Sequence, residues 1–228
     1  MPLKKSVGNM YDFVSHTWSP VKGRCKHNCS YCFMKKWGEL PPMHIDEKDL
    51  MTDLGEDKFI FVGHTIDLFA DDVPAEWIEK VLWRCREYPT NKYLFQSKNP
   101  ARFSEFLDKF PPSVVFGTTI ETNRTTYVES KAPSYIERAE AIGEMRELVE
   151  GCETIVTIEP IYDFDLDPLV AIIVTAKPTW INIGADSKGH DLPEPSKEQI
   201  VELVDTLQSK MEVKLKNNLK RIIGKKND

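Results

Sequence analysis

The sequence predicts an α/β protein whose parallel strands form a partial (βα)6 barrel of the TIM type. The first observation is that short β-branched or aromatic runs alternate six times with amphipathic stretches of helical period, which indicates right-handed βαβ units. The second is the length, because a complete eight-unit barrel needs about 250 residues and this chain has 228. Six units in that length favour a shorter, open barrel. A doubly wound sheet is the alternative, since periodicity does not separate the two folds.

Six runs are predicted to be the strands of this barrel. Apolar residues dominate both faces of several of them, as expected for strands that are covered on both sides. The runs are 11–18, 58–64, 92–97, 113–120, 153–161 and 179–185.

Stretches with apolar residues three or four positions apart are predicted to be the helices. Pro74 opens the first of them, where proline suits the first helical turn. The helices are 74–88, 99–110, 133–150, 167–176 and 196–222. The last is expected to be one continuous amphipathic helix at the end of a single domain that spans residues 1–228.

Composition and charge exclude several classes of protein. Hydrophobic residues make up 41% and charged residues 29% of the chain, which is ordinary for a soluble globular protein. No apolar run approaches the roughly 20 residues that span a bilayer, and the N-terminal residues lack the apolar stretch of a secretory signal. The five cysteines are odd in number and clustered, which argues against a disulfide framework and predicts a reducing, cytoplasmic setting. The net charge of −6 gives no general sign of nucleic-acid binding, although basic residues gather in 214–226.

Polar residues follow each predicted strand, at the rim where parallel α/β folds bind ligands. Any single loop residue is most often polar simply because loops are exposed, but the whole set predicts a site at one end of the barrel. In chain order the residues are Cys25, Cys29 and Cys32; Gly63, His64, Thr65 and Asp67; Ser97, Lys98 and Asn99; Glu121, Thr122, Asn123 and Arg124; Glu159, Tyr162 and Asp163; and Asp186, Ser187, Lys188 and His190.

Three cysteines, Cys25, Cys29 and Cys32, lie within eight residues in the spacing C-x3-C-x2-C. Thiolates select zinc, copper(I) or iron–sulfur clusters, and a structural zinc site needs a fourth ligand. The candidates for that ligand are His27, His44, Cys85 and Cys152. Both distant cysteines are expected to be structural, because buried free cysteine is common. A cluster of four irons on three cysteines instead leaves one iron open to bind a substrate or cofactor through nitrogen and oxygen.

With an aromatic residue, Tyr31, before the third cysteine, the motif resembles the C-x3-C-x-Φ-C signature of radical S-adenosylmethionine enzymes. In that family the motif follows the first strand of a partial (βα)6 barrel, which is where this chain places it. The resemblance implies that the three cysteines hold a [4Fe–4S] cluster whose open iron chelates the amino and carboxylate groups of S-adenosylmethionine. One electron, supplied by an external donor, then cleaves the cofactor to methionine and a 5′-deoxyadenosyl radical, which abstracts hydrogen from a substrate.

Six stretches are similar to an uncharacterised, phage-associated branch of that superfamily. They span residues 16–187, nearly all of the predicted barrel, and no substrate carries over with the resemblance. The stretches read "HTWSPVKGRCKHNCSYCF", "FVGHTIDLF", "YLFQSKNPARF", "VVFGTTIETNR", "IVTIEPIYDFD" and "WINIGADS".

The resemblance also suggests which residues of the rim bind the cofactor. Many members hold its amino group with a Gly-Gly-Glu-Pro-like stretch after the second strand, and here that place reads Gly63-His64-Thr65-Ile66-Asp67. Backbone carbonyls there can accept the same hydrogen bonds, and Asp67 can accept a charge-assisted one. Arginine suits the cofactor carboxylate, with a surface ion pair as the alternative role for Glu121 and Arg124; His64 is alternatively structural. The expected cofactor-binding residues are Tyr31, Gly63, His64, Thr65, Asp67, Glu121, Arg124 and Glu159.

The leading hypothesis for function is a radical S-adenosylmethionine enzyme, and the alternative is a non-catalytic zinc- or iron-binding interaction protein of mobile elements. An ordinary hydrolase ranks below both, because the sequence has no G-x-S-x-G, Walker or G-x-G-x-x-G motif. No second cysteine-rich region follows the barrel, which slightly favours a nucleotide, nucleic acid or small molecule over a peptide as substrate. The residues that could meet phosphates are Lys98, Arg102, Lys188 and the basic tail from Lys214 to Lys226.

Overall fold

The computed structural model describes residues 3–187 and 189–224. Its centre is one sheet with the strand order β1-β2-β5-β6-β7-β8-β9-β10. Within this sheet β1 pairs antiparallel with β2, and every other pair of neighbours is parallel. The first and last strands do not pair with each other, so the barrel is open. The α/β class and the partial barrel of parallel strands are confirmed.

The strands are β1 (Lys4–Lys5), β2 (His16–Trp18), β5 (Phe59–Val62), β6 (Lys92–Gln96), β7 (Val114–Thr119), β8 (Glu153–Ile158), β9 (Trp180–Ile183) and β10 (Glu212–Leu215). Two further strands, β3 (Val21–Lys22) and β4 (His44–Ile45), form a separate antiparallel pair. The segment that connects this pair carries the three cysteines.

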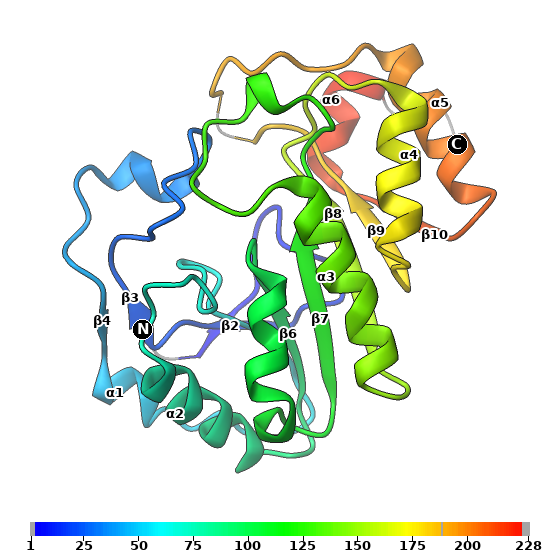
Figure 1. The fold of residues 1–228 in the computed structure, drawn as a ribbon. Helices are drawn as coiled ribbons and strands as arrows, with labels where there is room; N and C mark the ends of the chain where they lie inside the picture. Colours follow the sequence, from blue (N-terminus) through cyan, green and yellow to red (C-terminus); the bar gives the residue numbers. More distant parts are fainter. Residues whose placement is uncertain (1–2, 188, 225–228) are drawn as a thin grey trace.

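The α-helices are α1 (Glu47–Leu50), α2 (Ala75–Arg86), α3 (Tyr135–Leu148), α4 (Leu166–Thr175), α5 (Lys197–Gln208) and α6 (Lys220–Ile223). The 3-10 helices are η1 (Phe33–Trp37), η2 (Pro100–Lys109), η3 (Thr125–Tyr127) and η4 (Asn217–Leu219). Capping boxes open two of the long helices, with Ser134 and Glu137 at α3 and Ser196 and Gln199 at α5, so the first free N–H groups of each helix are bonded. Figure 1 shows α2, η2, α3 and α4 in this order over one face of the sheet.

The inner side of the sheet is filled by the segment before β2. Tyr11 and Val14 pack in a cluster with Leu94, Ile155 and Trp180, and the Tyr11 hydroxyl lies 2.7 Å from both Gln96 Oε1 and Thr157 Oγ1. The predicted strand 11–18 is therefore a strand only over its last three residues. Its earlier residues leave the sheet because their aromatic and apolar side chains fill the interior of the open barrel.

The prediction of one continuous helix over 196–222 is wrong. The helix α5 ends at Gln208, and the chain then pairs with β9 as the strand β10, with Val213 opposite Ile181 and Leu215 opposite Ile183. The stretch 211–216 alternates apolar and polar residues, which is strand period, and the edge of β9 offers free backbone groups that this strand satisfies. The amphipathic helical pattern of 196–222 hid that alternation.

None of the helices in the described ranges has the length and apolar character needed to cross a membrane. The cytoplasmic location and the single-domain organisation over residues 1–228 stay predictions.

Candidate functional site

The three cysteines lie on the segment between β3 and η1, and all three are free thiols. Cys29 is buried, with its Sγ 3.2 Å from the Ser130 hydroxyl. Burial raises the pKa of the Cys25 thiol to about 11. Hydrogen bonds from the backbone N–H groups of Asp67 and His27 act in the opposite direction, because they favour the thiolate. Among the residues that the structure describes, no three His, Cys, Asp or Glu side chains are arranged to hold one metal ion. An all-sulfur donor set with backbone N–H groups at a sulfur suits an iron–sulfur cluster.

The other two cysteines lie elsewhere. Cys85 is fully buried on α2. Cys152 comes just before β8, at the amino end of that strand and so at the end opposite the rim, and its Sγ lies 3.4 Å from the Met145 carbonyl. Neither is brought near the cysteine segment by the sheet order.

A buried histidine–aspartate pair ties the cysteine segment to the rim. His27 Nε2 lies 2.8 Å from Asp67 Oδ2, and the backbone N–H groups of Lys98 and Phe69 donate to the same carboxylate at 2.7 and 3.0 Å. Burial would raise the pKa of Asp67, but these hydrogen bonds, with His27 contributing most, outweigh it and hold the pKa below its usual value. Both carboxylate oxygens are thus engaged by protein donors, and Asp67 links the cysteine segment to the ends of β5 and β6.

A second buried cluster surrounds Glu121, at the end of β7. This side chain is only 1% exposed, and Arg138 Nη2 lies 3.0 Å from its Oε2. Lys98 Nζ contacts both Glu121 and the Tyr31 hydroxyl, and the Tyr31 hydroxyl donates to Glu121. Burial alone would raise the pKa of Glu121, but the charges of Arg138 and Lys98 hold it far below its ordinary value. One carboxylate therefore faces two cations beside the cysteine motif.

Tyr31 is the part of the motif that meets this cluster. Its side chain is 9% exposed and packs with Cys29 and Tyr162, with the two tyrosine rings 5.9 Å apart. Burial, and then the Glu121 charge, raise the pKa of Tyr31 well above its ordinary value, so the phenol stays a hydrogen-bond donor. The motif is thereby held against the ends of β7 and β8.

Arg124 is already paired. Its guanidinium contacts Asp163 and lies 2.7 Å, through Nη2, from Asp165 Oδ1. The ion pair that the sequence left as an alternative for Arg124 is present, whereas Glu121 is buried and not on the surface.

Glu159 joins a segment before β2 to the segment that follows β10. Its carboxylate accepts hydrogen bonds from Asn9 Nδ2 at 2.7 Å, Lys216 Nζ at 2.6 Å and Asn218 Nδ2 at 2.8 Å. Gly184 is required opposite, because a Cβ there would come within 2.7 Å of Glu159 Oε1. This carboxylate holds the N-terminal segment and the segment after β10 on the inner side of the barrel.

Gly63 follows β5, and His64 and Thr65 line a cavity of 240 Å³ beside it. His64 Nδ1 lies 2.9 Å from the Ser19 hydroxyl. Burial, with a smaller effect of the Lys4 charge, lowers the pKa of His64 to about 4, so its ring is neutral at pH 7. The other residues around this cavity are Lys4, Thr17, Ser19, Lys22, Gly23, Met34, Leu40, Pro41 and His44.

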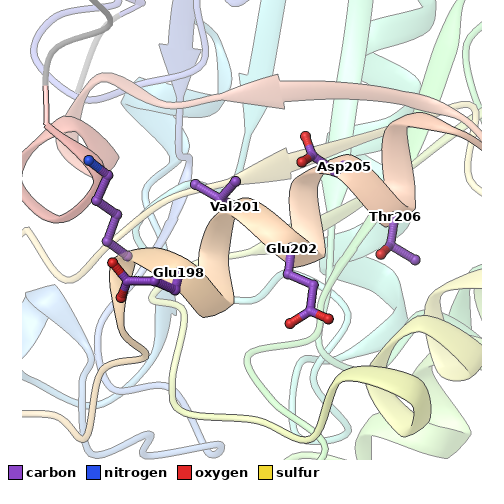
Figure 2. Close-up of a pocket in the computed structure, with 6 residues that line it drawn as sticks. Glu198, Val201, Glu202, Asp205 and Thr206 are labelled. Atoms are coloured by element: carbon purple, nitrogen blue, oxygen red, sulfur yellow. The ribbon is translucent and has the colours of Figure 1, made fainter.

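A larger hollow of 490 Å³ lies on α5, between Glu198 and Thr206 (Figure 2). Its lining comes from this one helix, which precedes β10 at the far end of the sheet from β2. Its carboxylates are not among any described group of side chains that could hold a metal ion, and it lies away from the rim, so it is not a candidate site.

Two of the basic residues that were expected to bind phosphates instead contact other parts of the protein. The Arg102 guanidinium donates to the backbone carbonyls of Ala70 and Val73, and Lys214 Nζ lies 4.2 Å from the centre of the Trp180 ring. Lys188, Lys225 and Lys226 lie outside the described residues.

Sequence reasoning missed the roles of His27 and Arg138 and left Lys98 to the substrate. The sequence does hold one sign that Arg138 is buried, because this charged residue adjoins the apolar stripe Ala139, Ile142 and Met145 of α3. No local pattern reveals that His27 turns towards Asp67, forty residues along the chain.

Comparison with solved structures finds spore photoproduct lyase. A double mutant of that enzyme with bound AdoMet (S-adenosylmethionine) and dinucleoside spore photoproduct matches with a TM-score of 0.65 and 12% sequence identity, over 96% of this chain and 77% of that chain. A single mutant with dinucleoside spore photoproduct matches with a TM-score of 0.61 and 13% identity, over 88% of this chain and 63% of that chain. This chain thus spans less than two thirds of the second structure. At these identities the likeness shows the fold.

No curated protein matches this chain, and the phage association stays a prediction. A family model matches residues 9–191, a range that contains the cysteine motif, Glu121 and Glu159. Because that match covers well over half of the sequence, this chain belongs to the family described as "Protein of unknown function (DUF5131)".

Proposed function

We propose that this protein is a radical S-adenosylmethionine enzyme. Cys25, Cys29 and Cys32 would hold a [4Fe–4S] cluster, and this cluster would supply the electron that cleaves S-adenosylmethionine to methionine and a 5′-deoxyadenosyl radical. The observation that carries the proposal is the attachment of the cysteine motif, through Tyr31, to Glu121 at the carboxyl end of β7. That rim is where open parallel sheets bind ligands. The bound AdoMet of the first structural neighbour supports the same choice of cofactor.

Lys98 is a better partner for the cofactor's carboxylate than Arg124. The cluster of Glu121, Arg138 and Lys98 has one negative and two positive charges, and it lies against Tyr31 of the motif. An anion bound there balances the second cation, and a partly buried ammonium forms a strong charge-assisted hydrogen bond with it. Arg124 already faces two carboxylates, so a third anion gains little from it.

The remaining rim residues position the motif and the cofactor. The His27–Asp67 pair fixes the segment between the first two cysteines. The chain turns at Gly63 with a positive φ of 77°, and the Gly63 carbonyl accepts the Ile66 backbone N–H at 3.1 Å. The carbonyl groups of His64 and Thr65 would accept from the cofactor's amino group. Glu121 positions Tyr31 and Lys98 and does not need to touch the cofactor.

We infer that the substrate is a nucleotide or nucleic acid. This inference is supported by the dinucleoside spore photoproduct that is named in the structural neighbours. Arg102 and Lys214 do not support it, because their side chains contact other parts of the fold. A non-catalytic zinc protein is the second candidate, and the free thiols on one segment are the feature that keeps it open.

One experiment tests the proposal. The protein is reconstituted without oxygen with iron and sulfide, reduced with dithionite and given S-adenosylmethionine, and 5′-deoxyadenosine is measured. We expect a brown protein that forms 5′-deoxyadenosine. A colourless protein with stoichiometric zinc and no product would decide for the second candidate.

A further inference from the structure

A cavity of 240 Å³ lies between the edge of the sheet and the segment that carries the cysteines. Lys4 of β1 and Thr17 of β2 line it from the sheet, and Met34 of η1 lines it from the segment between β3 and β4. His64 and Thr65 line it from the rim, and their carbonyl groups are those proposed to accept from the cofactor's amino group. A molecule in this cavity is therefore next to the proposed cofactor site.

The described residues around this cavity are basic on balance. They include Lys4 and Lys22 and no Asp or Glu. Lys22 is paired with Asp46, whereas Lys4 forms no ion pair within the described part of the chain. The neutral ring of His64 shares a hydrogen bond with Ser19, so the cavity also offers uncharged hydrogen-bonding groups. The lining thus suits an occupant that combines negative charge with polar edges, and it suits a cation poorly.

The helix η1 extends this cavity onto an exposed aromatic surface. Side chains three residues apart lie on the same side of a 3-10 helix, so Trp37 lies on the side of Met34, which lines the cavity. The Trp37 side chain is 67% exposed, and Phe33 at the start of the helix is 37% exposed. Exposed rings beside a cavity are typical of a binding surface. We call Phe33, Lys35, Lys36 and Trp37 the η1 surface.

The η1 surface lies in a strongly basic stretch of an acidic protein. Residues 21–37 contain five Lys or Arg and no Asp or Glu, whereas the whole chain has a net charge of −6. Lys35 and Lys36 pair with no carboxylate among the residues that the structure describes. Lys36 Nζ instead lies 4.7 Å from the centre of the Trp37 ring. Two cations and two rings are thus available to one ligand.

Lysines and exposed rings on one surface fit single-stranded nucleic acid, because unpaired bases stack on the rings and phosphates pair with the lysines. The cavity is smaller than the roughly 300–1,000 Å³ that encloses a drug-sized ligand, so it takes one base-sized group and not the surface of a folded protein. An acidic protein could pair with the lysines, but it would leave the cavity empty. A nucleic-acid strand uses both features.

We propose that the η1 surface and the cavity together bind single-stranded nucleic acid. Bases stack on the rings of the η1 surface, phosphates pair with its lysines, and one base enters the cavity beside His64 and Thr65. Enzymes that act on a base take it out of its stack into a pocket of this kind. This inference rests on the proposed function and specifies its substrate as a strand rather than a free nucleotide.

The experiment measures oligonucleotide binding to cluster-loaded, oxidised protein by fluorescence anisotropy. The probe has about 12 nucleotides, within the usual range of single-strand sites, and is used as single-stranded DNA, as RNA and as duplex DNA. We expect a single strand to bind at least about tenfold more tightly than the duplex, because only unpaired bases can stack on the rings. DNA and RNA of one sequence show which of the two strands is preferred.

The aromatic contact is tested with two exposed tryptophans. Trp37→Ala should weaken single-strand binding about tenfold at every salt concentration, through lost stacking. The matched control Trp83→Ala removes a ring that is 53% exposed on α2, and it should bind the strand as wild type does.

The phosphate contacts are tested across a salt series. Lys35→Gln/Lys36→Gln should reduce the slope of log affinity against log salt, by about 0.7 for each phosphate contact that is lost. The control Lys197→Gln/Lys210→Gln, whose lysines are exposed on and after α5, should keep the wild-type slope. Saturating S-adenosylmethionine should leave strand binding intact. Competition between the two would assign the cavity to the cofactor and overturn the proposal.

Formation of 5′-deoxyadenosine by the wild-type protein under dithionite separates this inference from the proposed function. A protein that binds the strand through Trp37 but forms no 5′-deoxyadenosine contradicts the proposed function alone. A protein that forms 5′-deoxyadenosine but binds no single strand at low salt, or binds it equally well after Trp37→Ala, overturns the nucleic-acid site. Polyglutamate that binds as tightly as the strand, and equally needs Trp37, assigns the surface to an acidic protein instead.

Discussion

Glu121 illustrates how single side chains build the rim of this barrel. A carboxylate that is 1% exposed is costly to bury unless its charge is paired and its oxygens are hydrogen-bonded. Arg138, Lys98 and the Tyr31 phenol meet both requirements. The same three contacts join α3, the end of β6 and the cysteine motif, so the pairing that stabilises the carboxylate also positions the candidate site.

The first prediction concerns the thiols. Cys29→Ser should abolish iron incorporation, because a hydroxyl is a poor substitute for a thiolate as a cluster ligand, and Cys152→Ser should keep the wild-type iron content. Iron and sulfide per chain after anaerobic reconstitution measure both. A full cluster in the Cys29→Ser protein would contradict the assignment.

The second prediction separates two cations. Lys98→Met should weaken S-adenosylmethionine binding more than tenfold, about 1.4 kcal/mol, because an ammonium beside the motif is lost while Glu121 keeps Arg138. Arg124→Met should change binding less than about threefold. Equilibrium dialysis on folded, cluster-loaded protein is the measurement, with thermal unfolding of each variant as the control. A larger effect at Arg124 would restore the assignment first made from sequence.

The third prediction is a pH dependence from His64. The pKa of His64 is about 4 in the folded protein, whereas its ordinary value is 6.5. Between these two pH values the unfolded chain therefore binds a proton at His64 that the folded protein does not bind. The free energy of unfolding should therefore fall as pH drops from 6.5 towards 4, by up to about 3 kcal/mol from this group. His64→Asn should flatten that slope in urea unfolding, and the exposed His44→Asn should not. Equal slopes in all three proteins would refute the buried, neutral state of His64.

At the scale of secondary-structure elements, the carboxyl ends and the amino ends of the parallel strands make different contacts. Each parallel strand from β5 to β8 is followed by residues that hold the cysteine segment or the segments around Asn9 and Lys216. The amino ends carry ordinary surface pairs, such as Glu153 with Lys92. The strand β8 shows the contrast within one element, since Glu159 follows its carboxyl end and Glu153 opens it.

The fourth prediction uses that contrast. Glu159→Gln should raise hydrogen exchange in both 9–14 and 212–219, because the carboxylate binds Asn9, Lys216 and Asn218 at once. It should cost about 2 kcal/mol of stability, because the partly buried Lys216 ammonium loses its charge-assisted hydrogen bond. Glu153→Gln should cost less than about 1 kcal/mol, since its pair is partly exposed. Exchange that rises in only one of the two segments would show that Glu159 does not join them.

At the scale of the whole molecule, an open barrel must fill its interior without closing the sheet. The N-terminal segment performs this task, with Tyr11 and Val14 among inner side chains of β6, β8 and β9. The outer face is covered by helices in a separate and larger core. The barrel is thus stabilised from both sides, and its carboxyl rim is left to the cysteine segment.

The fifth prediction tests this filling. Tyr11→Ala should destabilise the protein by about 3–5 kcal/mol, the usual cost of removing a buried aromatic ring. Tyr11→Phe should cost only about 1 kcal/mol, because it loses the hydroxyl contacts to Gln96 and Thr157 and keeps the ring. Urea unfolding gives both values. Similar small losses for the two variants would mean that the ring does not fill the barrel.

The sequence by itself determined the alternation of strands and helices and the grouping of three cysteines after the first strand, and its length favoured an open barrel over a doubly wound sheet. These features depend on short sequence periods and spacings. Such periods are local because a helix buries one face and a covered strand buries both. It also identified Glu121 and Asp67 as rim residues, because the ends of parallel strands meet at one edge.

Only the tertiary structure decided what those rim residues do. The rim residues Asp67, Glu121, Arg124 and Glu159 pair with side chains that lie 40, 17, 41 and 150 residues away in the sequence, which are His27, Arg138, Asp165 and Asn9. No local pattern records such a pairing. The strand β10 was decided in the same way, since 212–215 became a strand when the edge of β9 offered it hydrogen bonds. Local periodicity favours a helix or a strand for each segment. The free backbone groups and the charges of distant segments then decide whether that helix or strand forms, and which residues remain available for a ligand.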